Sequence, residues 1–91
     1  MSSLFPPGHI VATPGALDAL RGSGPALAVL LARHLSGQWG DLDAHDQQAN
    51  DAALRDGSRL LSAYTLDDGT RIWVLTEADR SSTCVLLPQE Y

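Results

Sequence analysis

Oxygen-bearing side chains gather in the segment 41–51, which contains no lysine or arginine. Its four aspartates are Asp41, Asp43, Asp46 and Asp51. Asp46 and Asn50 are four residues apart, so on a helix they would share a face, and His45 adjoins them. Carboxylate and amide oxygens are ligands for hard cations, which makes a metal site one interpretation. Because no ligand spacing here matches a metal-binding loop, we favour a capped helix with a solvated acidic face.

A second polar group, Glu77, Asp79 and Arg80, follows a predicted strand. Two carboxyls beside a cation could serve general acid–base catalysis. The alternative is a tight turn in which Asp79 hydrogen-bonds the backbone and Arg80 pairs with a carboxylate. We favour the turn, because the chain has no nucleophile and base at a recognisable spacing. A combined enzyme or metal site would require one pocket that holds Asp41, Asp46, Asn50, Glu77 and Asp79.

The other reactive side chains have simpler interpretations. His34 comes near the end of a predicted helix, where an imidazole favours the helix dipole or lies partly buried. Cys84 is the single cysteine, which excludes an intrachain disulfide and a cysteine-rich zinc site. Inside a predicted strand it is a small hydrophobe. We predict no cofactor and no catalytic residue, and we favour a protein without enzymatic activity.

These side chains must be positioned by a predicted antiparallel sheet in residues 57–91. Two strands rich in Leu, Ile, Val, Tyr, Trp and Thr, residues 58–65 and 71–78, flank Asp68-Gly69. Asp-Gly is the preferred pair for a two-residue hairpin turn, which would place Tyr64 opposite Trp73. A third strand, residues 83–87, ends at Pro88, which cannot donate to a ladder.

That register assigns the hairpin side chains to two faces, because side chains alternate along a strand. One face would carry Leu61, Ala63, Thr65, Ile72, Val74 and Thr76, and the other Leu60, Ser62, Tyr64, Leu66, Trp73, Leu75 and Glu77. Neither face is polar throughout. We therefore expect helices over one face and a partly open face on the Tyr64–Trp73 side.

The first half of the chain is predicted to be helical. Thr13-Pro14 is an N-cap followed by proline at the first helical position. Ser23 could cap a second helix with Pro25 in its first turn, and Asp41 or Asp43 could cap a third. The leucines of the second helix recur at three- and four-residue spacing. The helices are predicted at residues 13–21, at 23–35, and from 42 or 43 to 55.

We therefore predict an α+β domain with two to three N-terminal helices packed on a C-terminal three-stranded antiparallel β-sheet. Residues 1–91 would form one domain, with an irregular arm at 1–8, a helical part at 13–56 and a β-meander at 57–91. Residues 9–12 could add a short edge strand.

Charge argues against several classes of function. The net charge is −5, and all six basic residues are arginines spread along the chain. A nucleic-acid-binding protein has a clustered basic face instead, so we expect no direct contact with nucleic acid or with an anionic membrane. The N-terminal residues lack the basic and apolar regions of a signal peptide, and no segment is long enough to cross a bilayer. We expect a cytoplasmic protein.

The order of several short motifs is similar to that in a family of small bacterial proteins. The motifs are Arg33-His34, Gly37-Gln38-Trp39-Gly40-Asp41, Asp46, Asn50, the run from Gly57 to Tyr64, Thr76 to Ser81 and Leu86 to Tyr91. Members of this family occur on plasmids and other mobile elements, and are labelled plasmid-related or, in some cases, a type I restriction enzyme subunit. The chain has no methyl-donor motif that would support the restriction label. The resemblance implies a mobile-element origin and no particular activity.

Three hypotheses for function follow. The first is a small acidic protein-binding module, in its specific form a mobile-element inhibitor of a host defence nuclease, of the anti-CRISPR or anti-restriction type. Its partner-binding residues would be carboxylates for steering and exposed aromatics for affinity, namely Trp39, Asp41, Asp43, Asp46, Asn50, Tyr64 and Trp73. The second is the enzyme or metal-binding protein described above. The third is a homodimer joined through a sheet edge or the second helix.

Overall fold

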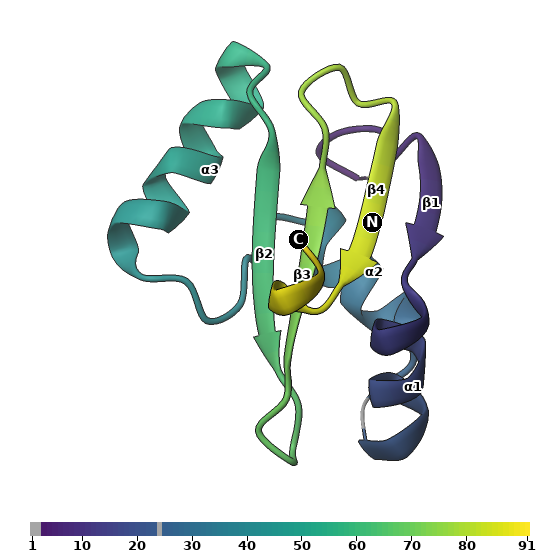
Figure 1. The fold of residues 1–91 in the computed structure, drawn as a ribbon. Coiled ribbons are helices and arrows are strands. Elements are labelled where there is room, and N and C mark those ends of the chain that lie inside the picture. Colours follow the sequence, from purple (N-terminus) through teal and green to yellow (C-terminus); the bar gives the residue numbers. More distant parts are fainter. Residues whose placement is uncertain (1–2, 24) are drawn as a thin grey trace.

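The computed structural model describes residues 3–23 and 25–91, apart from the side chain of Ser23, and has an α+β fold (Figure 1). Four strands form one sheet in the order β1-β4-β3-β2. The elements in chain order are β1 (His9–Ala12), α1 (Pro14–Ser23), α2 (Leu27–Leu35), α3 (Ala44–Asp56), β2 (Leu60–Thr65), β3 (Arg71–Thr76), β4 (Ser82–Leu86) and the 3-10 helix η1 (Pro88–Glu90). None of the described helices is long and apolar enough to cross a membrane.

The sheet is mixed, which corrects the prediction of three antiparallel strands. β2, β3 and β4 do form the expected antiparallel meander. The short segment 9–12 is a full fourth strand, and it runs parallel to β4, with Val11 beside Cys84. This pairing joins residues about seventy positions apart, and no local sequence pattern indicates it. Only the presence of a short edge strand at residues 9–12 could therefore be predicted.

The hairpin between β2 and β3 is paired one residue out of step with the prediction. Tyr64 lies opposite Ile72, and Trp73 lies opposite Ala63. The turn contains three residues rather than two: the Leu66 N–H bonds the Thr70 carbonyl oxygen at 2.8 Å, and Gly69 has φ of 89° while Asp68 keeps a negative φ. This is a type I turn with a glycine bulge. The slip moves every β3 side chain to the other face relative to β2.

The predicted N-cap residues are confirmed for two of the three helices, α1 and α3. The Ala16 N–H bonds Thr13 Oγ1 at 3.1 Å, and the Asp46 N–H bonds Asp43 Oδ1 at 2.8 Å. α2 begins later than predicted, because Ala26 is extended (ψ 148°) and Pro25 precedes the helix. The predicted cap at Ser23 is a side-chain assignment that falls outside the described atoms, as do Met1, Ser2 and Gly24.

Helices α1 and α2 cover one face of the sheet, and α3 lies along the outer side of β2 (Figure 1). The larger core cluster joins the first two helices to the sheet through Ala16, Leu20, Leu30, Tyr64, Leu66, Ile72, Val74 and Val85. A smaller cluster under α3 contains Phe5, Trp39, Ala53 and Leu60. The opposite sheet face is crossed only by the C-terminal segment around η1 in the part of the chain shown. That face is therefore the less covered of the two.

Candidate protein-contact surface

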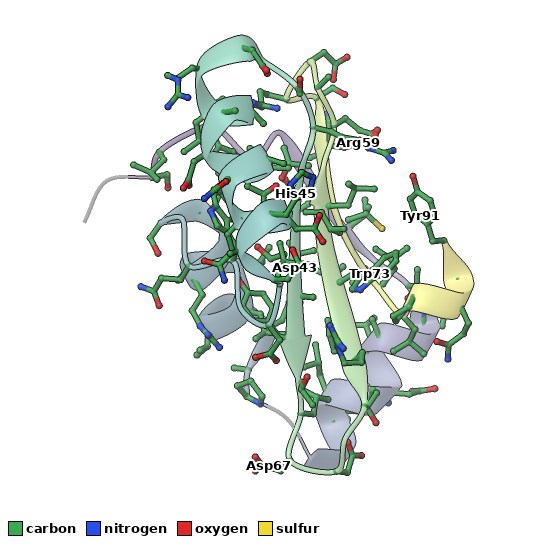
Figure 2. All side chains as sticks on the ribbon, turned by 90° about the vertical axis from the view of Figure 1, so that its left-hand side faces the viewer. Asp43, His45, Arg59, Asp67, Trp73 and Tyr91 are labelled. Atoms are coloured by element: carbon green, nitrogen blue, oxygen red, sulfur yellow. The ribbon has the colours of Figure 1, made fainter. Side chains whose placement is uncertain are left out.

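The acidic residues of segment 41–51 are exposed on α3 and on the loop before it. Asp41, Asp43, Asp46 and Asp51 are all exposed, and we call them the acidic face (Figure 2 labels Asp43 and His45 on α3). Asp43 caps the helix, and the Asp51 carboxylate accepts a hydrogen bond from Trp39 Nε1 at 3.1 Å. None of the four forms an ion pair with a described residue. Their negative charge is therefore available to a partner.

Trp39 and Asn50, which were predicted to contact a partner, are buried instead. Their exposed fractions are 4% and 5%. The Trp39 ring packs against Phe5 and His34, with ring centroids 6.4 Å and 5.7 Å away. Both residues hold α3 and its preceding loop against the sheet, so neither side chain is exposed as the prediction expected.

Asn50 and the loop before α3 cover the outer edge of β2. The Asn50 side chain donates to the Leu61 carbonyl oxygen at 2.7 Å and accepts from the Leu61 N–H at 3.1 Å. Two residues on, the Ala63 N–H bonds the Trp39 carbonyl at 3.1 Å and the Ala63 carbonyl accepts from the Asp41 N–H at 2.7 Å. The outward hydrogen-bonding groups of Leu61 and Ala63 on this edge are therefore used within the chain.

Tyr64 is also buried, with 2% exposure, contrary to the prediction of an exposed aromatic. Its hydroxyl donates to the Gln38 carbonyl oxygen at 2.7 Å, and the Arg33 guanidinium lies 4.6 Å from its ring centre. Burial raises the pKa of its phenol above the ordinary value. The register slip accounts for the error, because it turns Tyr64 toward the helices.

Trp73 is the one predicted aromatic that keeps part of its surface exposed. It lies half-buried on the sheet face opposite α1 and α2, with the exposed Tyr91 ring 5.8 Å away (Figure 2). On the same face, one row of side chains crosses the four strands and consists of Val11, Cys84, Leu75 and Leu61. We call Val11, Leu61, Trp73, Leu75 and Cys84 the open sheet face. Their apolar side chains are half-buried, apart from Val11, which is half exposed.

Of the open sheet face, only Trp73 and Leu75 were predicted to lie on a partly open face. Apolar residues on both sides of the hairpin strands correctly indicated one partly open face, but the predicted register assigned Tyr64 to it and Leu61 to the core side. Cys84 was expected to be a buried hydrophobe and is half-buried here. Burial raises the pKa of its thiol, and the carboxylates of Glu90 and Glu77 add to the effect. A raised pKa keeps the thiol protonated and poorly nucleophilic.

Arg80 binds backbone carbonyls rather than a carboxylate. Its guanidinium donates to the carbonyl oxygens of Ser58 at 2.7 Å and Ala53 at 3.1 Å, which ties the end of α3 to the β3–β4 turn. Asp79 accepts from the Ser81 N–H at 2.9 Å, as expected for a turn, and its bonds to Ser81 lower the pKa of its carboxyl. Glu77 makes no side-chain bond to Arg80 in the described part. The group is a structural turn.

The two polar groups lie at opposite ends of α3. Asp43 caps the N-terminal end, whereas Arg80 contacts Ala53 near the C-terminal end. A thirteen-residue helix spans about 20 Å. Among the residues described, no three His, Cys, Asp or Glu side chains come together as metal ligands. The single pocket that the enzyme or metal hypothesis required is therefore absent from this arrangement.

A histidine–serine pair does exist, but in the interior. His34 Nδ1 lies 2.6 Å from Ser62 Oγ, and His34 Nε2 lies 2.9 Å from Thr76 Oγ1. Thr76 in turn bonds Thr83, whose hydroxyl donates to the Pro7 carbonyl. Because that carbonyl can only accept, two further directions are fixed: Thr76 donates to Thr83, and His34 Nε2–H donates to Thr76.

This polar chain cannot act on a substrate. His34, Ser62, Thr76 and Thr83 are each 0% exposed. Burial lowers the pKa of His34 to about 4, so the imidazole is neutral at physiological pH and its Nδ1 accepts a hydrogen bond from Ser62. Its function is to satisfy four buried polar side chains and to join α2, β2, β3, β4 and the N-terminal arm.

No family model, no curated protein and no solved structure matches this chain.

Proposed function

We propose that the chain is a non-catalytic protein-binding module whose contact surface combines the open sheet face with the acidic face of α3. The observation that carries the proposal is the half-buried apolar row of Leu61, Leu75 and Cys84 with Trp73 beside it, on the sheet face that no long helix covers. An apolar patch of this kind on a small domain is a common feature of interaction sites.

The position of Trp73 supports this proposal. It is flanked by Leu86 on β4 and Ala63 on β2, both buried. Its ring also contacts the Tyr91 ring edge to face, and the Arg59 guanidinium lies 5.6 Å from the Tyr91 ring centre. Aromatic side chains held in this way contribute much of the affinity of protein interfaces. The site therefore offers an apolar centre with a polar border.

The acidic face supports a partner of positive charge. It adjoins the open sheet face through Leu61, whose backbone is bonded by Asn50 of α3. Carboxylates without internal ion pairs steer a basic partner toward the surface and raise the association rate. Enzymes that bind nucleic acid carry basic surfaces, which are complementary to these carboxylates. In its specific form, the proposal is an inhibitor of a defence nuclease, supported by this charge and by the resemblance to mobile-element proteins.

A pair of charge-matched variants tests the acidic part. Asp41→Asn/Asp46→Asn removes two carboxylates from the acidic face, and neither carboxylate accepts a hydrogen bond from a described residue. Asp18→Asn/Asp67→Asn changes the net charge equally on α1 and at the hairpin tip. In affinity captures from a bacterial host lysate, the first pair should lose a partner that the second retains, and double-stranded DNA should compete with that partner.

The apolar part is tested by Leu75→Lys, which introduces a charge at the centre of the open sheet face. Val29→Lys, on the outer side of α2, is the control of the same chemistry. The proposal expects the same partner to be lost with Leu75→Lys and kept with Val29→Lys. Identical captures by the wild type, Leu75→Lys and Asp41→Asn/Asp46→Asn would overturn it.

A further inference from the structure

The two edges of the sheet are treated differently by the fold. The outer edge of β2 is covered by α3 and the loop before it, through Asn50, Trp39 and Asp41. β1 forms the other edge, and no described element lies beyond it (Figure 1). Among the described strands, β1 therefore has the free edge.

The free hydrogen-bonding groups on β1 can be identified from its ladder. The His9 N–H bonds the Ser81 carbonyl and the Thr13 N–H bonds the Val85 carbonyl, each at 2.9 Å. In a parallel ladder, alternate residues bond the same neighbour, so the odd residues of β1 face β4. The N–H and C=O groups of Ile10 and Ala12 must point away from the sheet. They make no hydrogen bond to any described residue.

The side chains of β1 lack the usual protection of an edge strand. Ile10 and Val11 are 47% and 50% exposed, and the strand contains no charged residue and no proline. Natural sheet edges are blunted by lysine, proline, bulges or a covering element. An apolar, unprotected edge is a template for pairing with another strand.

We propose that this edge pairs with β1 of a second copy of the chain, antiparallel and about a two-fold axis, to give a continuous eight-stranded sheet. In this register Ile10 of each copy forms hydrogen-bonded pairs with Ala12 of the other, and Val11 lies opposite Val11. The interface is isologous, because one segment supplies both sides.

Only this register uses all the free groups. A register centred on Ile10 would place Ala12 opposite Gly8, where the chain has left the extended conformation (φ 65°). A register centred on Ala12 would place Ile10 opposite Pro14, which has no N–H to donate. Centring on Val11 gives two complete hydrogen-bonded pairs from a four-residue strand.

The negative charge of the chain lies too far from β1 to repel a second copy that binds there. Segment 41–56 contains five aspartates and one arginine, which is most of the net charge of −5, and it lies along β2 at the far edge of the sheet. Strands are spaced by about 4.8 Å, so the two β2 edges of the dimer would be about 34 Å apart. That is several Debye lengths at physiological salt. Because the β2 edge is covered, assembly stops at two copies.

Sedimentation across protein concentration tests the dimer. We expect a reversible monomer–dimer equilibrium with a dissociation constant between about 10 µM and about 1 mM, because the shared strand is short. Ile10→Pro removes an outward N–H without removing a bond to β4, and proline is tolerated on the outer side of edge strands. It should abolish the dimer, whereas Val29→Lys, on an equally exposed position of α2, should leave it unchanged. A wild type that stays monomeric to the highest concentration overturns the proposal.

Disulfide trapping tests the register and does not depend on the folding of Ile10→Pro. Paired residues without mutual hydrogen bonds have Cα atoms about 4.5 Å apart, within the range of a disulfide. Val11→Cys, in a Cys84→Ala background because Cys84 is its neighbour within the chain, should cross-link two copies on mild oxidation. Val29→Cys in the same background should not. Equal cross-linking of both variants, or of neither, would overturn the proposed pairing whether or not the open sheet face binds a partner.

Discussion

The Asn50 carboxamide presents to Leu61 the same two hydrogen-bonding groups that a neighbouring strand would present. Its nitrogen donates to the Leu61 carbonyl and its oxygen accepts from the Leu61 N–H, at 2.7 Å and 3.1 Å. A side chain from a helix therefore takes the place of a fifth strand. This contact, with the loop at residues 39–41, closes one edge of the sheet and positions the acidic face beside the open sheet face.

Asn50→Ala is expected to destabilise the fold by about 2–4 kcal/mol, because it leaves two backbone groups of β2 without partners in a poorly hydrated position. The measurement is the free energy of unfolding in urea. Gln48→Ala, at an exposed position of the same helix, is the control and should change stability by less than about 0.5 kcal/mol. Equal effects would mean that the pairing contributes nothing.

Stability is expected to fall as the pH is lowered from 6.5 toward 4. Burial holds the pKa of folded His34 at about 4, against 6.5 for the ordinary group. In that window the unfolded chain binds a proton that the folded chain does not, so acid favours unfolding. The loss attributable to His34 approaches about 3 kcal/mol at pH 4.

The check is urea unfolding at several pH values, with His34→Gln compared with the wild type. The variant should be less stable at pH 7, because it disturbs the buried chain to Ser62 and Thr76, and its stability should depend less on pH. A double variant of the exposed His9 and His45 should keep the full dependence. A wild-type slope unaffected by His34→Gln would contradict the assignment.

Gly40→Ala is expected to lower the free energy of unfolding by more than Gly57→Ala, which introduces backbone strain alone. A Cβ at Gly40 would overlap the Ala63 carbonyl oxygen, where the loop pairs with β2, and φ there is 79°. Gly57 has nearly the same φ, 81°, with no atom within 4 Å of an added Cβ. Gly57→Ala should cost about 1–2 kcal/mol, and Gly40→Ala should exceed it clearly in thermal or urea unfolding.

Arg80→Ala is expected to lower the free energy of unfolding by about 2 kcal/mol, because the guanidinium bonds carbonyl oxygens of Ser58 and Ala53 and charge-assisted bonds are the stronger ones. Arg80→Lys should recover only part of the loss, since one ammonium cannot reproduce the fork. Arg71→Ala, at an exposed strand position, is the control. A loss with Arg71→Ala as large as with Arg80→Ala would indicate a general charge effect instead.

Local chemistry was readable from the sequence where the cause lies within a few residues. Thr13 and Asp43 cap helices through N–H groups three positions away, and such signals depend on no other part of the chain. The strands β2, β3 and β4 were predicted from composition and alternation. The turn between β2 and β3 was recognised, but Asp67-Asp68-Gly69 suits either a two- or a three-residue turn, because Gly69 has a positive φ in both.

Tertiary structure decided everything that depends on distant neighbours. The pairing of β1 with β4, the burial of Trp39, Asn50 and Tyr64, and the identity of the open sheet face all follow from contacts across the fold. Burial is a property of what lies opposite a side chain, and one extra residue in a turn exchanges the two faces of a strand. Sequence determined which segments are helices and strands; packing determined which of their side chains a partner can reach.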